Sequence, residues 1–241
     1  ADDDVAGFVM GTVSGTLSEG SPQTATVSVV LQGAPISDVI IDVVINPTDE
    51  ITTSVSSLTF TSLNWNTDQT ITLSSLDDFL IDGTVITSIT FSIDSSSDSA
   101  FTGLSSQVLG VPNLDDEVAG FTLSPLYGGS LLEGSTDTVS FTVVLDAEPD
   151  PFDNIILDIV SLDTTESSVS SSTESLVFTN SNWNVPQTVV VNSVDDVTLD
   201  GTVTSTLEVS VNSLSPAVFS SLASQTIRVT TLDDDVAGFR L

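Results

Sequence analysis

Carboxylates are almost the only side chains in this sequence that could do chemistry. The 241 residues include 34 Asp and Glu against 2 Lys and Arg, with no His and no Cys, and the formal net charge is −32. Both basic residues are arginines, Arg228 and Arg240. Without imidazole, thiolate or amine side chains, the usual nucleophiles and the usual nitrogen and sulfur zinc ligands are excluded. Nucleic acids and anionic membrane surfaces are improbable partners, because both require clustered cations.

The acidic residues recur in a fixed order along the chain. The string DDDVAGF at 2–8 returns as DDEVAGF at 115–121 and again as DDDVAGF at 233–239. Between these copies each repeat carries an EG pair, an N-W-N phrase and a DD pair followed by a further acid. Self-similarity at the length of one domain predicts repeat 1 over 1–114 and repeat 2 over 115–232. Residues 2–4 would end a preceding repeat, and 233–241 would open a third while completing the acidic motif of repeat 2, so we expect a segment of a longer tandem array.

The stretches between the acids alternate apolar and polar residues, which is typical of β-strands with one buried face. The 39% hydrophobic content and the mean hydropathy of +0.33 oppose disorder despite the charge. Seven short strands are expected in each repeat, and in repeat 1 they are the VAGF segment at 5–8, then 24–31, 38–45, 57–60, 69–76, 86–94 and 107–111. An all-β fold of two tandem seven-stranded β-sandwiches follows, and we expect them in an elongated arrangement.

Strand parity gathers most of the acids at one end of each sandwich. If successive strands run antiparallel, the loops after the first, third and fifth strands lie at the same end as the exit from the seventh. The acids at this end are Glu19, Asp49, Glu50, Asp77, Asp78, Asp82, Asp115, Asp116 and Glu117 in repeat 1, and Glu133, Asp163, Asp195, Asp196, Asp200, Asp233, Asp234 and Asp235 in repeat 2.

Clustered carboxylates repel one another, and the chain has no lysine to compensate them. A metal ion is the natural counter-charge. Oxygen ligands on flexible loops suit Ca²⁺, which takes six to eight of them, better than Mg²⁺ or a transition metal. The adjacent pairs Asp77–Asp78 and Asp195–Asp196 could each bridge two neighbouring ions. The sequence therefore predicts calcium at the acidic end of each repeat, where one domain passes into the next.

The EG pair, the DD-x-x-x-D element and the terminal DDD-x-AG together resemble the Calx-β domain over nearly the whole of both repeats. The resemblance implies an immunoglobulin-like sandwich with a small cluster of Ca²⁺ ions at its tip. It also implies an acidic ligand in the loop after the third strand, which is Asp163 in repeat 2 and either Asp49 or Glu50 in repeat 1. The other implied ligands are Glu19, Asp77, Asp78, Asp82, Asp115, Asp116, Glu117, Glu133, Asp195, Asp196, Asp200, Asp233, Asp234 and Asp235, with the backbone carbonyls of Leu80 and Thr198.

The phrase F-T-x-x-N-W-N-x-x-Q at 60–69 and 178–187 resembles repeats of large bacterial surface adhesins of the SprB gliding-motility type. This resemblance implies an extracellular, secreted, calcium-stiffened structural repeat of a cell-surface adhesin filament. Its partners would be neighbouring repeats, with any surface or glycan ligand elsewhere in the full-length protein.

Other classes are less well supported by the sequence. Enzymatic activity is not expected, because the acids recur in every repeat and the chain has almost no basic residue to orient a substrate. No apolar run is long enough to insert into a membrane. The alternative function is a ligand- or carbohydrate-binding β-sandwich module of a secreted protein. Trp65 and Trp183, one per repeat, are expected to close the sandwich rather than to stack on a sugar.

Overall fold

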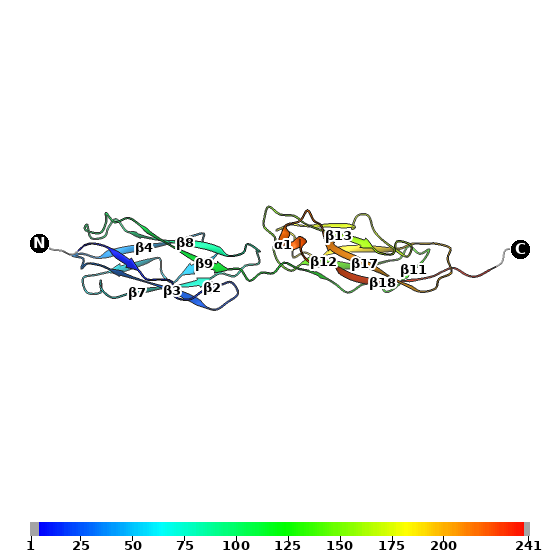
Figure 1. Ribbon diagram of the computed structural model, residues 1–241, viewed down its shortest axis with the longest axis horizontal. Coiled ribbons are helices and arrows are strands. Elements are labelled where there is room, and N and C mark those ends of the chain that lie inside the picture. Colours follow the sequence, from blue (N-terminus) through cyan, green and yellow to red (C-terminus); the bar gives the residue numbers. More distant parts are fainter. Residues whose placement is uncertain (1–4, 239–241) are drawn as a thin grey trace. The chain divides into compact units, whose positions relative to one another are not determined.

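The computed structural model describes residues 5–238, so the predicted motif residues 2–4 and 239–241 lie outside the described residues. The chain divides into two compact units (Figure 1). The first contains Ala1–Asp78 and Asp82–Asp116, and the second contains Phe79–Ile81 and Glu117–Leu241. This division falls two residues after the one made on the sequence, and it assigns a tripeptide of repeat 1 to the second unit.

Two β-sheets form the first unit. One sheet has the order β1-β3-β7-β5, and the other has the order β2-β9-β8-β4-β6. All neighbours pair antiparallel except β2 and β9, which run parallel. The strands are β1 (Phe8–Met10), β2 (Leu17–Ser18), β3 (Thr24–Leu31), β4 (Val39–Asn46), β5 (Ile51–Thr53), β6 (Ser57–Phe60), β7 (Gln69–Ser75), β8 (Val85–Ile93) and β9 (Gln107–Leu114).

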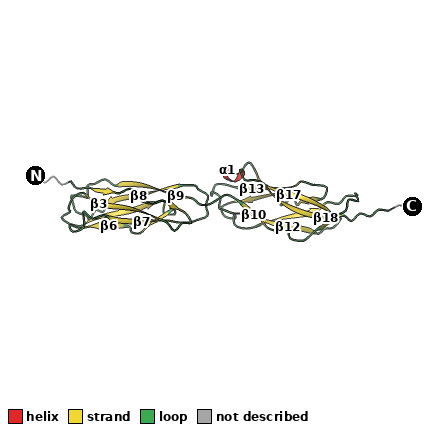
Figure 2. Cartoon of the chain, turned by 60° about the horizontal axis from the view of Figure 1, so that its bottom comes forward, coloured by secondary structure: helices red, strands yellow, loops and turns green. Residues whose placement is uncertain are grey.

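The second unit repeats this topology strand for strand. Its sheets have the orders β10-β12-β16-β14 and β11-β18-β17-β13-β15, with β11 parallel to β18. One helical turn, α1, precedes the last strand and is the only helix among residues 5–238 (Figure 2). The elements are β10 (Phe121–Leu123), β11 (Leu131–Leu132), β12 (Thr138–Leu145), β13 (Ile155–Ser161), β14 (Ser167–Val169), β15 (Ser175–Phe178), β16 (Gln187–Ser193), β17 (Val203–Val211), α1 (Ala217–Ser220) and β18 (Gln225–Leu232).

The predicted fold class, two tandem all-β immunoglobulin-like sandwiches, is confirmed. Six of the seven strands expected in each repeat are present near their expected positions, and two more occur in each, β2 and β5 in the first and β11 and β14 in the second. The first expected strand, the VAGF segment, is wrong in its bounds, because β1 and β10 begin only at its last residue, Phe8 and Phe121. These extra strands have only two or three residues, which is too few for an alternating pattern to be visible. The correction matters because the extra strands position acidic side chains. No helix in the described part of the chain is long and apolar enough to span a membrane.

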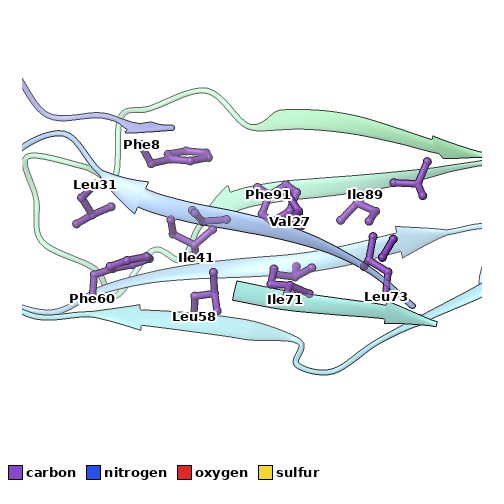
Figure 3. Packing of buried hydrophobic residues seen from close by; sticks show 14 of the residues in the cluster. Phe8, Val27, Leu31, Ile41, Leu58, Phe60, Ile71, Leu73, Ile89 and Phe91 are labelled. Carbon is purple, nitrogen blue, oxygen red and sulfur yellow. The ribbon is translucent and has the colours of Figure 1, made fainter. Parts of the chain in front are cut away.

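Each unit has its own hydrophobic core between its two sheets. In the first unit the core includes Ile41, Phe60, Ile71 and Phe91, all fully buried (Figure 3). The burial alternates along the strands, as in β3, where every second residue faces the core. Trp65 packs, partly buried, against this core, and Trp183 packs in the same way in the second unit. The two tryptophans therefore lie against the sandwich interiors, as expected of residues that close them.

Two isoleucines of the first unit provide a matched test of this packing. Ile71 is fully buried, whereas Ile36 is 98% exposed. Because Ile71→Ala leaves a cavity, it should lower the free energy of unfolding by about 2–5 kcal/mol. Ile36→Ala should change it by less than about 0.5 kcal/mol. Urea unfolding followed by circular dichroism measures both, and equal effects would contradict the described core.

Candidate metal centre

The parallel pairing of β2 with β9 brings two acidic segments together at one end of the first unit. Ser18 is paired with Leu114, so Glu19 and the acids at 115–117 leave adjacent strands at the same point. The Glu19 N–H donates to the Leu114 carbonyl at 2.8 Å. In the second unit Leu132 is paired with Leu232 in the same register, and Glu133 takes the equivalent place. The parallel strand pairing thus places the repeated acidic residues at the same end of each unit.

A buried glutamate stands directly before β5 and before β14. Glu50 accepts a backbone hydrogen bond from the Leu76 N–H at 2.8 Å, and Glu166 accepts the equivalent bond from the Val194 N–H at 3.0 Å. Their side chains are 6% and 3% exposed. The two glutamates therefore occupy the same position in the two repeats, and the loop that holds each one is tied to the strand after the N-W-N turn.

The described residues contain three groups of three acidic side chains, and within each group one carboxylate oxygen from every side chain lies within 4.8 Å of the others. One group consists of Glu19, Asp116 and the residue that follows it in the chain, Glu117. The second unit holds two groups that share Glu133. One is completed by Glu166 and Asp200, and the other by Asp196 and Asp235. The shared glutamate is therefore placed to bridge two neighbouring cations, a role that the sequence suggested for adjacent Asp-Asp pairs.

The two glutamates of the second unit are buried, whereas Asp200 is exposed and Asp196 and Asp235 are partly exposed. Glu133 is 1% exposed, and the Oε2 atoms of Glu133 and Glu166 are buried with no hydrogen-bond partner. The same holds for Oδ2 of Asp235. A buried charge without a partner costs several kcal/mol, so these carboxyls are stabilised either by taking up a proton or by a positively charged ligand.

Electrostatics and burial shift the protonation of these groups strongly. Burial, followed by the charges of Asp200, Glu133 and Asp163 and a hydrogen bond with Asp200, raises the pKa of Glu166 to about 7. Burial and the neighbouring aspartates also raise the pKa of Glu133. In the first unit, desolvation and then the charge of Glu50 raise the pKa of Asp82 to about 6. Such shifts mark a place where like charges are held together.

The first acid of each exit triplet is held by backbone hydrogen bonds. Oδ2 of Asp233 accepts from the Gly201 N–H at 2.9 Å, and Oδ1 accepts from the Asp235 N–H at 2.8 Å, which together keep the pKa of Asp233 below its usual value. In the first unit Asp115 Oδ2 accepts from the Gly83 N–H at 2.7 Å. These two aspartates tie the acidic loop before β8 or β17 to the exit of the last strand, and so hold the other acids of that end in position.

The structure places most of the predicted ligands at these ends. Asp82 lies beside Glu50, Asp78 and Asp115, whose charges act on it. Burial, followed by the charges of the neighbouring Asp233, Asp234, Asp196 and Asp195, raises the pKa of Asp235. The predicted ligands that belong to one of the three groups of acidic side chains are Glu19, Asp116, Glu117, Glu133, Asp196, Asp200 and Asp235.

The acids expected as ligands after the third strand differ in burial, and their ligand role stays a prediction. Asp49 is exposed, whereas Glu50, the alternative in the sequence, is buried. Oδ1 of Asp163 accepts bonds from the N–H and the Oγ1–H of Thr165 within its own turn, and the sequence missed Glu166. Asp77, also predicted as a ligand, is exposed and outside the three groups. The available signal was that a glutamate directly precedes the segments 51–53 and 167–169 in both repeats.

The two predicted carbonyl ligands lie in loops that make other contacts. Leu80 belongs to the tripeptide Phe79–Ile81 of the second unit, where it forms a parallel β-bridge with Glu148. The Trp183 Nε1–H donates to Glu148 Oε2 at 3.1 Å, and its ring lies 5.7 Å from that of Phe79. The Thr198 N–H donates to Asp196 Oδ1 at 2.6 Å. A ligand role for these two carbonyls stays a prediction.

The residues present fit a calcium ion. The donors are carboxylate oxygens only, they come from separate loops, and two fully enclosed glutamates have oxygens that no hydrogen bond satisfies. Ca²⁺ accepts such an all-oxygen set, whereas zinc and copper favour nitrogen or sulfur. Glu133, Glu166, Asp200, Asp196 and Asp235 would hold it in the second unit.

The raised pKa of Glu166 predicts a pH dependence for the metal-free protein. Between its ordinary value of 4.5 and about 7, the folded chain keeps a proton on Glu166 that the unfolded chain has released. Unfolding therefore becomes easier as pH rises through this window. Glu166→Gln should flatten the fall in melting temperature between pH 4.5 and 7 in a chelator, whereas Glu174→Gln, at an exposed residue, should not. Parallel profiles for wild type and Glu166→Gln would contradict the assignment.

No protein-family model matches the chain, and no curated protein sequence matches it. Solved structures of similar fold include the D0-D1 domain of intimin, with 15% identity over 94% of this chain and 97% of that chain, at a TM-score of 0.31. Domains 5-6 of the S-layer protein SbsC share 18% identity over 96% and 100%, at a TM-score of 0.28. The calcium binding domain CBD12 of CALX1.1 shares 13% identity over 82% and 76%, at a TM-score of 0.32. At these values the likenesses transfer no function to this chain.

Proposed function

We propose that these sandwiches are structural repeats whose acidic ends are neutralised and ordered by Ca²⁺. One observation carries the proposal: Glu133 and Glu166 are buried side by side with unsatisfied oxygens. The only basic side chain among residues 5–238 is Arg228, which is exposed on β18. When both glutamates are ionised, the positive charge that would compensate them has to come from outside the described chain.

Calcium at this end would restrain the path of the polypeptide. Asp235 is the third residue after β18, and Asp116 and Glu117 are the second and third residues after β9, so the candidate ligands belong to the segment by which the chain leaves each sandwich. An ion that binds this segment together with Glu133 or Glu19 would fix its direction. Covalent continuity then passes that order to the next repeat. Metal-dependent stiffness of a tandem array is the expected result.

Within this function, the finer role that we propose is a calcium-stiffened segment of an extracellular, cell-surface adhesin filament, of the gliding-motility type. The support is the internal repetition of the acidic motif, the acidic composition and the resemblance of the N-W-N phrase. Neighbouring repeats would be the partners of each sandwich. A carbohydrate-binding module is less well supported, because Trp65 and Trp183 pack against the cores.

Removal of calcium should destabilise the chain. For a calcium concentration about 100-fold above the dissociation constant, binding contributes about 2.7 kcal/mol per independent site. Calorimetry should show a higher melting temperature in calcium than in EDTA, and small-angle scattering should show a narrower spread of inter-repeat angles. Magnesium at the same concentration is the control and should do less, because Mg²⁺ dehydrates reluctantly. Unchanged melting and scattering in EDTA would refute the proposal.

A side chain introduced at Gly134 would crowd the carboxylates of the candidate site, and this provides a test of the site. The φ of Gly134 is +66°, and a Cβ there would meet Asp234 Oδ2 at 2.9 Å and Asp195 Oδ1 at 3.3 Å. Gly129 has a similar φ of +80° but open space around it. Both alanine variants should lose about 1–2 kcal/mol of stability to backbone strain. Only Gly134→Ala should also weaken calcium binding, by about tenfold. Calorimetric titration measures this, and equal affinities for the two variants would place the ion elsewhere.

A further inference from the structure

The two acidic ends differ at one buried position in the last strand of each unit. Asn113 of β9 is paired with Leu17 and Val85, and Thr231 of β18 is paired with Leu131 and Val203 in the identical register. Both side chains are fully buried. The two residues are therefore structural equivalents that face the glutamates of their own unit.

Asn113 joins the two buried glutamates of the first unit. Its Nδ2 group donates to Glu19 Oε1 at 2.9 Å and lies 3.2 Å from both Oε2 and the backbone carbonyl of Glu50. On the other side of the amide, Oδ1 accepts from Ser75 Oγ at 2.6 Å. The Glu50 backbone carbonyl can only accept a hydrogen bond, and it therefore sets which way the amide points, with its N–H groups toward the acids. The first unit thus carries a built-in donor between two carboxylates.

Thr231 cannot do the same in the second unit. Its Oγ1–H reaches only the backbone carbonyl of Glu166, at 3.4 Å. Oε2 of Glu133 and Oε2 of Glu166 consequently lack any hydrogen-bond partner. These two glutamates and Asp200 bring carboxylate oxygens within 4.8 Å of one another, and among the described residues no such group joins Glu19, Glu50 and Asp82.

We propose that the Asn113 amide, which lies between Glu19 and Glu50, takes the place of a cation in the first repeat. The second repeat binds two cations, one of them at the equivalent place between Glu133 and Glu166, and the first repeat therefore binds one ion fewer. This inference rests on the proposed calcium function and deepens it. An amide satisfies carboxylate oxygens by hydrogen bonds without occupying the coordination sphere of a metal. Its N–H groups, pointing at the same oxygens, exclude a cation from that place.

The two repeats therefore share one topology but differ in how many of their acidic groups require metal. The first repeat keeps its inner glutamates satisfied without metal and needs calcium only at its outer group, Glu19, Asp116 and Glu117. The second repeat depends on metal at both groups. Residue 113 or its equivalent is therefore the determinant of how many ions a repeat takes.

Reciprocal exchange of the two residues tests the inference. Native mass spectrometry and calorimetric titration with calcium on the whole chain count the bound ions. Relative to wild type, Asn113→Thr should bind one ion more and Thr231→Asn one ion fewer. Thr230→Asn, on the neighbouring and partly exposed position of β18, is the matched control and should leave the count unchanged.

Melting in EDTA gives a second readout that does not require metal. Thr231→Asn should raise the metal-free melting temperature at neutral pH, and Asn113→Thr should lower it. If Asn113→Thr does not fold, Thr231→Asn alone decides the question. Equal ion counts for wild type, Thr231→Asn and the control would overturn the inference while leaving calcium binding intact. A wild-type chain that binds no calcium would instead overturn the proposed function.

Discussion

The structure depends on one constraint: the sheet topology holds carboxylates close together, and these carboxylates repel one another. The parallel pairing of β2 with β9, and of β11 with β18, fixes Glu19 and Glu133 beside the acidic exits of the last strands. The short strands β5 and β14 add a buried glutamate from the opposite sheet. Since almost no basic side chain exists, each end must find its counter-charge outside the chain or replace it with hydrogen bonds.

The sandwich can support this cost because its core is separate from its acidic end. Every unit buries a continuous set of Val, Ile, Leu and Phe side chains between two sheets. Burial at about 25 cal/mol per Å² stabilises the strands, and the strand ends then hold the loops in place whether or not the charges are neutralised. Such a scaffold, with repelling carboxylates at one end, allows a metal ion to order the loops at that end. The fold itself does not require the ion, because the core forms without it.

The two repeats show two solutions to the same electrostatic problem. Asn113 satisfies Glu19 and Glu50 with its amide, whereas Thr231 leaves Glu133 and Glu166 with oxygens that nothing in the described chain satisfies. The register of the last two strands is identical in both, so at this position the two ends differ in the side chain and not in the strand pairing. Tandem repeats of one topology can therefore differ in their demand for metal while they keep the same strand order.

The amino-acid sequence by itself determined the repeat, the β class and the end of each sandwich at which the acids gather, because period, alternation and strand parity are local or countable properties. It could not choose Glu50 over Asp49 or find Glu166, since which acid of a turn points inward depends on where β5 and β14 begin, and strands of three residues leave no alternating pattern. Only the tertiary structure revealed Asn113. An asparagine in a strand has no distinctive pattern until long-range pairing sets its amide between two glutamates that lie 94 and 63 residues away in the chain.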